Sequence, residues 1–129
     1  MAEPDLIGIV VNDMAAALRF YRMLGLDIPA DADSEPHVEY TTRGGFRVAW
    51  DTLELIQSLN DDWPEPSGHR TVLAFKCENP TDVDVLYKKV MQEGYQSHKE
   101  PWDAFWGQRY AVVIDPDGNL VDLFANFQD

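Results

Sequence analysis

The hydrophobic positions of the chain follow first a strand pattern and then a helix pattern. Leu6–Val11 is apolar at odd and even positions alike, which is typical of a strand covered on both faces. From Met14 to Leu24, apolar residues recur at spacings of three and four, which predicts an amphipathic helix. Asn12-Asp13 offers an N-cap for this helix, and Gly25 suits its left-handed end. Short apolar runs separated by glycines or polar pairs then predict three strands, over His37–Thr42, Phe46–Trp50 and Leu53–Ser58.

The same order of elements begins again after a polar stretch. Residues 60–68 are rich in Asp, Pro and Gly, which is typical of a linker. A strand is predicted over Arg70–Cys77, followed by a helix that starts at Asn79-Pro80 and ends at Gly94. Three further strands are predicted over Tyr95–His98, Gln108–Ile114 and Asn119–Ala125, the last two joined by the turn Asp115-Pro-Asp-Gly118.

This internal repeat determines the predicted fold class. We expect an α+β protein of two tandem βαβββ modules within one domain, residues 1–129, with module 1 at about 5–59, a linker at about 60–68 and module 2 at about 69–127. Each module would form a four-stranded, cup-shaped sheet with a helix on one face. The other face must be buried against the second module or against a second chain.

The composition limits the possible partners. The net charge is −13, from 23 acidic and 10 basic residues, so binding to nucleic acid is not expected. The charge favours a cationic ligand by steering, although it also serves simple solubility. No apolar run is long enough to span a membrane, and the N-terminus is acidic where a signal peptide is basic. With Cys77 as its one cysteine, the chain is expected in the cytoplasm.

Three segments resemble the vicinal oxygen chelate superfamily of glyoxalases, extradiol dioxygenases and bleomycin-resistance proteins. They are Ile9–Asp13, Phe20–Gly25 and Asp115–Phe124, which occur in the family's order and at its distances. Within the superfamily, the segments Ile28–His37, Val48–Thr52 and Pro101–Tyr110 look most similar to drug-binding resistance proteins, especially the mitomycin-binding kind. The resemblance implies a homodimer, with or without exchange of modules, and two clefts that bind a planar drug.

The metal ligands of the superfamily's enzymes lie on the first and last strands of each module. The resemblance assigns these positions to Leu6, Glu54, Val72 and Asp122. Two of the four are apolar, and two carboxylates without imidazole suit hard, oxygen-preferring ions at best. His37, His69 and His98 show no metal-binding spacing. We therefore expect neither a metal nor another cofactor and no catalytic residues.

The aromatic residues are the main candidates for ligand binding. Trp50 ends a predicted strand, and Trp102, Phe105 and Trp106 lie in a predicted loop before Tyr110. Clustered tryptophans in a loop expose costly apolar area unless they bind something. They either stack on a flat ligand or pack in the core or a dimer interface. Arg109 and Tyr110 alternate on their strand, so only one of them faces the cup.

Three polar residues complete the candidate site. Glu54 and Asp122 are expected on inner strands, where they either receive the amine or hydroxyl groups of a ligand or form ion pairs with Arg47 and Arg109. His37 begins a strand at the border of the cup and is a candidate polar contact.

Together these observations favour a protein that binds and sequesters a planar aromatic, quinone or cationic natural product without converting it. The first alternative is a metal-dependent lyase, isomerase or dioxygenase of the glyoxalase kind with an atypical ligand set. The second is an interaction or sensory module in which Trp50 and Trp106 contact another protein.

Overall fold

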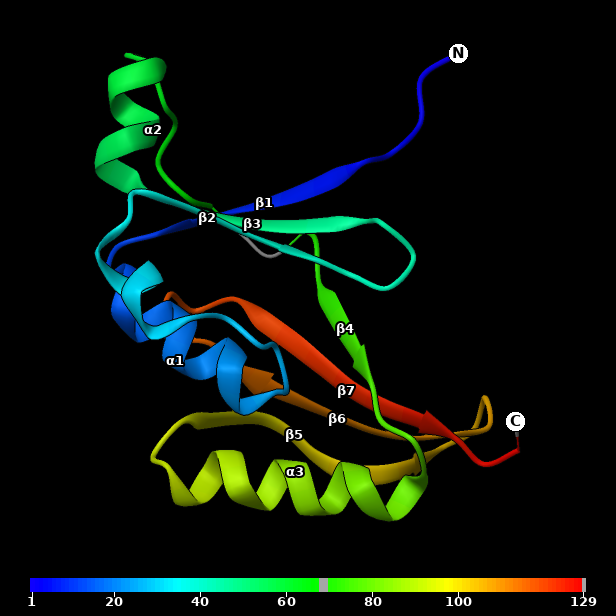
Figure 1. Cartoon of the computed structure of the whole chain (residues 1–129). Coiled ribbons are helices and arrows are strands. Elements are labelled where there is room, and N and C mark those ends of the chain that lie inside the picture. Colours follow the sequence, from blue (N-terminus) through cyan, green and yellow to red (C-terminus); the bar gives the residue numbers. More distant parts are fainter. Residues whose placement is uncertain (68–69, 129) are drawn as a thin grey trace. The chain divides into compact units, whose positions relative to one another are not determined.

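The computed structural model describes residues 1–67 and 70–128, so His69 lies outside the described residues. The chain divides into two compact units, Met1–Pro66 and Ser67–Asp129. The boundary falls inside the predicted linker. Each unit carries its own sheet, one of three strands and one of four, and the predicted α+β class is confirmed (Figure 1).

The first unit contains a three-stranded sheet in the order β1-β3-β2. Its central strand β3 pairs with β1 in parallel and with β2 in antiparallel orientation. The predicted N-cap of α1 is confirmed, because the Asp13 side chain accepts a hydrogen bond from the Ala16 amide. In chain order the elements are β1 (Leu6–Val11), α1 (Met14–Met23), the 3-10 helix η1 (Ala30–Ser34), β2 (His37–Thr41), β3 (Arg47–Thr52) and α2 (Leu53–Leu59).

The two faces of this sheet differ in polarity. Val48 and Trp50 of β3 are buried, and the Trp50 ring lies 5.3 Å from the ring of Tyr21 on α1. Because neighbouring residues of a strand point to opposite faces, Arg47 and Asp51 lie on the face away from α1. Helix α1 therefore covers the face of Val48 and Trp50, and the opposite face carries Arg47 and Asp51 beside the apolar Leu6 and Ala49.

The predicted strand Leu53–Ser58 is wrong, because this segment forms the helix α2. The Thr52 hydroxyl accepts a hydrogen bond from the Leu55 amide at 3.2 Å and caps the helix. Leu, Glu and Gln also have high helix propensity. A short apolar run fits a strand and a helix equally well by periodicity, and here the cap decides between them.

The second unit has the predicted βαβββ order. It consists of β4 (Leu73–Lys76), α3 (Pro80–Gln92), β5 (Gln96–Ala104), β6 (Gln108–Ile114) and β7 (Leu120–Asn126). The sheet order is β4-β7-β6-β5, with β4 parallel to β7 and the other pairs antiparallel. Asn79 caps α3 as predicted, and Pro80 occupies its first turn.

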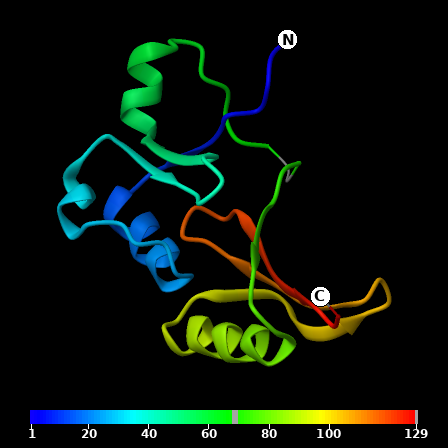
Figure 2. The ribbon, with the colours of Figure 1, turned by 45° about the vertical axis from the view of Figure 1, so that its right-hand side comes forward.

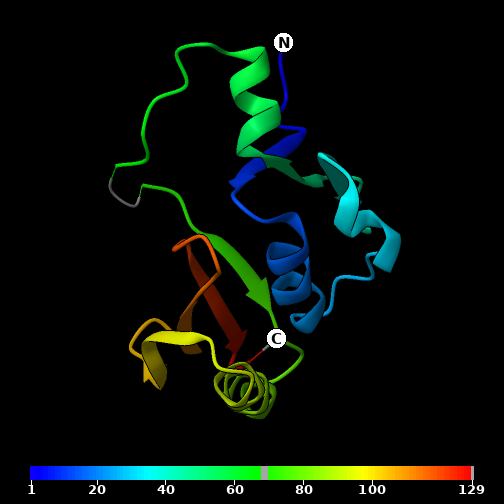
Figure 3. The same cartoon turned by 90° about the vertical axis from the view of Figure 1, so that its left-hand side faces the viewer.

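Helix α3 covers one face of this sheet, and Figure 3 views it nearly along its axis. Ala111, Val113, Val121, Leu123 and Ala125 are fully buried. They point to the same face of the sheet as Arg109, whose guanidinium pairs with Asp84 of α3 at 2.9 Å. The alternate residues of these strands, which include Tyr110 and Asp122, therefore point away from α3. This second face carries the candidate site.

Strand β5 is longer than predicted. It runs to Ala104, so Trp102 lies in a strand and not in a loop. Phe105 and Trp106 form the turn to β6, which Gly107 completes with a positive φ of 95°. In Figure 2 this turn, drawn in gold, projects past the end of α3.

In the described part of the chain, no helix is long and apolar enough to cross a membrane.

Candidate functional site

A cavity of about 380 Å³ lies on the face of the second sheet that points away from α3. Val72, Val112 and Leu120 supply its apolar surface, and Val112 is buried in the middle of the sheet. Trp102, Tyr110 and Asp122, three of the predicted site residues, line this cavity together. The prediction that only one of Arg109 and Tyr110 faces the site is confirmed, and that residue is Tyr110.

His98 and Lys99 also line the cavity, although the sequence reading did not select them. Lys99 pairs with Val112 and Trp102 pairs with Tyr110, so one extra residue is inserted into β5 between them. This β-bulge turns Lys99 and Trp102 to the same face, whereas regular alternation would separate them. Pro101 inside the strand is the sequence signal for such an irregularity.

Tyr110 and Asp122 form the polar centre of the cavity. The Tyr110 hydroxyl and the Asp122 carboxylate interact between the neighbouring strands β6 and β7. Burial, together with the negative charge of Asp122, raises the pKa of Tyr110 to about 12. Burial also raises the pKa of Asp122, while the hydrogen bond from Tyr110 acts in the opposite direction. Asp122 is thus a half-buried acceptor on the surface of the cavity. It does not pair with Arg109, the ion pair considered above.

Trp106 supports the cavity from outside. Its ring meets Trp102 and Tyr110 edge to face, with centroid distances of 5.6 and 5.3 Å. Its indole N–H donates to Gln108 Oε1 at 2.7 Å, and the Gln108 amide donates to Asn126. Trp106 therefore orients two cavity residues, and Phe105, 91% exposed, packs on its other side.

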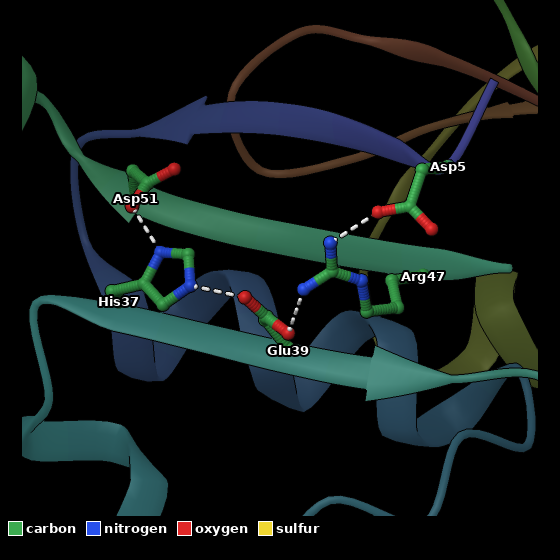
Figure 4. A network of polar contacts seen from close by, with 5 residues as sticks. All are labelled: Asp5, His37, Glu39, Arg47 and Asp51. Carbon is green, nitrogen blue, oxygen red and sulfur yellow. Dashed lines mark hydrogen bonds and ion pairs between the residues drawn. The ribbon is translucent and has the colours of Figure 1, made fainter. Parts of the chain in front are cut away.

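His37 belongs to a polar network on the first sheet (Figure 4). Its Nδ1 lies 2.5 Å from Asp51 Oδ1 and its Nε2 lies 2.7 Å from Glu39 Oε2. Glu39 also accepts a hydrogen bond from Arg47, which reaches Asp5 in turn. Both ring nitrogens face carboxylates, so hydrogen bonds to Glu39 and Asp51 raise the pKa of His37. The network requires a protonated imidazole.

Two predicted site residues have surroundings that do not suit ligand contact. Trp50 has no exposed surface in the core of the first unit, so no ring face is available for stacking. Glu54 lies in the first turn of α2 and not on an inner strand, which corrects its expected position. Arg47 pairs with Asp5 and Glu39, so the ion pair considered between Glu54 and Arg47 does not form.

The strand pairing also corrects one of the positions assigned to metal ligands. Asp122 of β7 pairs with Ala74 of β4, two residues after Val72. In the first unit, Ala49 of β3 pairs with Gly8 of β1, two residues after Leu6. The counterpart of Asp122 is therefore Ala49 and not Glu54.

The residues present do not fit a transition metal. Leu6, Ala49 and Val72 have side chains without a donor atom, which leaves one carboxylate. Within residues 1–67 and 70–128, no group of three or more His, Cys, Asp or Glu side chains is arranged to hold a metal ion.

Comparisons with known proteins agree with the fold. The family model "Glyoxalase/Bleomycin resistance protein/Dioxygenase superfamily" matches residues 4–123. The uncharacterised protein YraH of Bacillus subtilis is 27% identical over 126 residues, which cover 92% of this chain and 94% of YraH. A glyoxalase/bleomycin resistance protein/dioxygenase family enzyme from Burkholderia phytofirmans superposes with a TM-score of 0.83 at 21% identity, covering 97% of this chain and 99% of the enzyme. The hypothetical protein SA1046 of S. aureus superposes with a TM-score of 0.79 at 20% identity, covering 97% and 95%.

Proposed function

This chain belongs to the glyoxalase/bleomycin resistance protein/dioxygenase superfamily, and we propose that it binds and sequesters a planar aromatic natural product without converting it. The observation that carries the proposal is the shared cavity of Trp102, Tyr110 and Asp122. It combines two aromatic rings with a half-buried carboxylate. Three of the four positions assigned to metal ligands in this fold are occupied by Leu6, Ala49 and Val72, which cannot coordinate a metal.

The size and lining of the cavity suit a flat ring system. Its volume of about 380 Å³ lies at the lower end of the range of about 300–1,000 Å³ that is common for small-molecule sites. Contact between aromatic rings contributes about 0.5–1.5 kcal/mol beyond the burial of apolar area. Val112 and Leu120 supply further apolar surface, while Asp122 supplies a polar contact that fixes the orientation of the ligand.

Binding alone is enough for a protective role, as in bleomycin- and mitomycin-binding resistance proteins. A protein that lowers the free concentration of a toxic compound needs affinity and abundance but no catalytic group.

The proposal is tested by titrating the intrinsic tryptophan fluorescence of the purified protein with planar aromatic drugs. Saturable quenching with one ligand per cavity is expected, because Trp102 lines the cavity and the Trp106 ring contacts Trp102. A broad panel that causes no saturable quenching would remove the proposal. Stoichiometric transition metal in protein purified without chelators would favour the metal-dependent enzyme instead.

We further propose that the protein works as a homodimer, as the family resemblance implies. Phe105 is 91% exposed and Trp106 is 48% exposed, and both belong to the projecting β5–β6 turn. Apolar side chains exposed in this way are common in protein interfaces. Light scattering of the wild type and of the Phe105→Asp variant tests this, with a dimer expected for the former and a weakened dimer for the latter.

A further inference from the structure

The strand register arranges the cavity residues in two rows across the second sheet. One row runs from Lys99 on β5 through Val112 on β6 to Asp122 on β7. Since neighbouring strands lie about 4.8 Å apart, Lys99 and Asp122 are separated by about 10 Å at the backbone. The next row places Trp102 beside Tyr110. A cation and a carboxylate thus lie at opposite ends of an apolar surface.

The β5 end of the cavity offers hydrogen-bond donors. The Lys99 ammonium lies 5.2 Å from the centroid of the Trp102 ring. The indole Nε1 of Trp102 is buried without a hydrogen-bond partner among the described residues, so the donor that a ligand can reach is the exposed Lys99 ammonium. An oxygen acceptor on a ligand would suit this end of the cavity.

The β7 end offers an acceptor. The Asp122 carboxylate lines the cavity and has free acceptor capacity beside the neighbouring Tyr110, because a carboxylate has about four lone-pair positions. Its burial makes an additional donor favourable, since desolvated charges gain most from hydrogen bonds. An amine or hydroxyl group of a ligand would suit this end.

We propose that the cavity selects an aromatic ligand with opposite polarity at its two ends: a carboxylate or carbonyl oxygen toward Lys99, and an amine or hydroxyl toward Asp122. The inference rests on the proposed binding function and narrows its ligand class. It disfavours purely cationic drugs, because the tethered Lys99 ammonium already occupies the face of Trp102 that a ligand cation would use. The protein's charge of −13 does not reverse this, since charges beyond about 8 Å are screened at physiological salt.

The test combines truncated ligands with single substitutions. The probes are an aminonaphthoic acid with its two groups at opposite ends of the ring system, naphthoic acid and aminonaphthalene. Calorimetric titration of the wild type should show about tenfold tighter binding of the bifunctional probe than of either truncated probe, the usual effect of a hydrogen bond to a charged group.

Each substitution should cancel one of these differences. Lys99→Met should bind aminonaphthalene as tightly as the bifunctional probe, because the partner of the carboxylate is gone. It should still bind naphthoic acid more weakly than the bifunctional probe. In Asp122→Asn, the difference in affinity between the bifunctional probe and naphthoic acid should be smaller than in the wild type. The variant should still bind aminonaphthalene more weakly than the bifunctional probe. Lys88→Met and Glu93→Gln, exposed positions of α3 and its C-terminal cap, are matched controls that should behave like the wild type.

The outcomes separate the inference from the proposed function. If all three probes bind equally well, or aminonaphthalene binds best, the inference is wrong and the proposal of aromatic binding survives. If no probe binds and planar drugs also leave the fluorescence unchanged, both are wrong. If Lys99→Met discriminates among the three probes as the wild type does, the assignment of a ligand oxygen to the β5 end of the cavity is also wrong.

Discussion

Lys99 and Trp102 lie on the same face of β5 although they are three positions apart, and the Lys99 Nζ lies 5.2 Å from the Trp102 ring centroid. The β-bulge between them creates this contact, since it shifts the register by one residue. The bulge therefore brings the cation and the largest aromatic surface of the cavity together, and both become testable parts of a single binding site.

Trp102→Ala should weaken binding of planar aromatic compounds by about tenfold, because the ring contributes stacking and apolar contact area. The measurement is a calorimetric titration, which does not depend on tryptophan fluorescence. Trp63→Ala is the matched control, since Trp63 is 41% exposed and lies outside the cavity. Equal losses in the two variants would argue against Trp102 as a ligand contact.

Asp122→Asn should leave the protein as stable as the wild type, or more stable, at neutral pH. Burial raises the pKa of Asp122, so the folded state holds the proton more tightly than the unfolded state does, and ionisation opposes folding. The stability difference between variant and wild type should shrink as the pH falls through the raised pKa, and it should vanish below the ordinary value of 3.8. Urea unfolding at several pH values measures this, and a clearly less stable variant at neutral pH would contradict it.

The same substitution should lower the pKa of Tyr110 from about 12. In the wild type, burial and the neighbouring carboxylate both oppose formation of the phenolate. Replacement of the carboxylate by an amide removes the second contribution and leaves the first. Ultraviolet titration of the tyrosines should show the most alkaline phase moving to lower pH, and an unmoved phase would mean that Asp122 does not influence Tyr110.

Trp50→Phe should destabilise the protein without changing ligand affinity. Trp50 is fully buried against Tyr21, so the smaller ring leaves a void, and complete removal in Trp50→Ala should cost about 3–5 kcal/mol. Chemical unfolding gives the stability, and titration of the folded variant gives the affinity. A stable Trp50→Phe variant with lost binding would restore the prediction that Trp50 contacts the ligand.

The His37 network should make stability depend on pH. Hydrogen bonds to Glu39 and Asp51 raise the pKa of His37 above its ordinary value of 6.5. Their contribution is therefore complete below that value and is lost as the pH rises through the raised pKa. Between about pH 6 and about pH 9 the wild type should lose more stability than His37→Gln, which has no titrating ring. Parallel pH dependence of the two unfolding midpoints would show that the network does not stabilise the fold.

The sequence predicted the repeat well because its signals are local. The Asp13 and Asn79 caps and the positive φ of Gly25 and Gly94 are confirmed, since each needs only its own neighbours. The strand predicted at Leu53–Ser58 failed because its apolar spacing also fits a helix, and the Thr52 cap was overlooked.

The candidate site was predicted only in part because it depends on strand register. Trp102, Tyr110 and Asp122 were selected and line one cavity, whereas Lys99 was missed because a bulge cannot be counted from alternation. The assignment of Glu54 failed for a related reason: the pairing of Ala49 with Gly8 becomes visible only in the sheet.

A thermal-shift comparison of the wild type and Trp102→Ala tests the central claim most directly, with planar aromatic compounds, divalent metals and a chelator added in parallel. A compound present at 100 times its dissociation constant should stabilise the wild type by about 2.7 kcal/mol, and the variant by clearly less. A protein that sequesters aromatic compounds should show this shift with them, and no change with metals or the chelator. Stabilisation by a metal, or loss of stability with the chelator, would contradict sequestration without a metal. It would also mean that Leu6, Ala49 and Val72 do not occupy the positions of the metal ligands in the superfamily's enzymes.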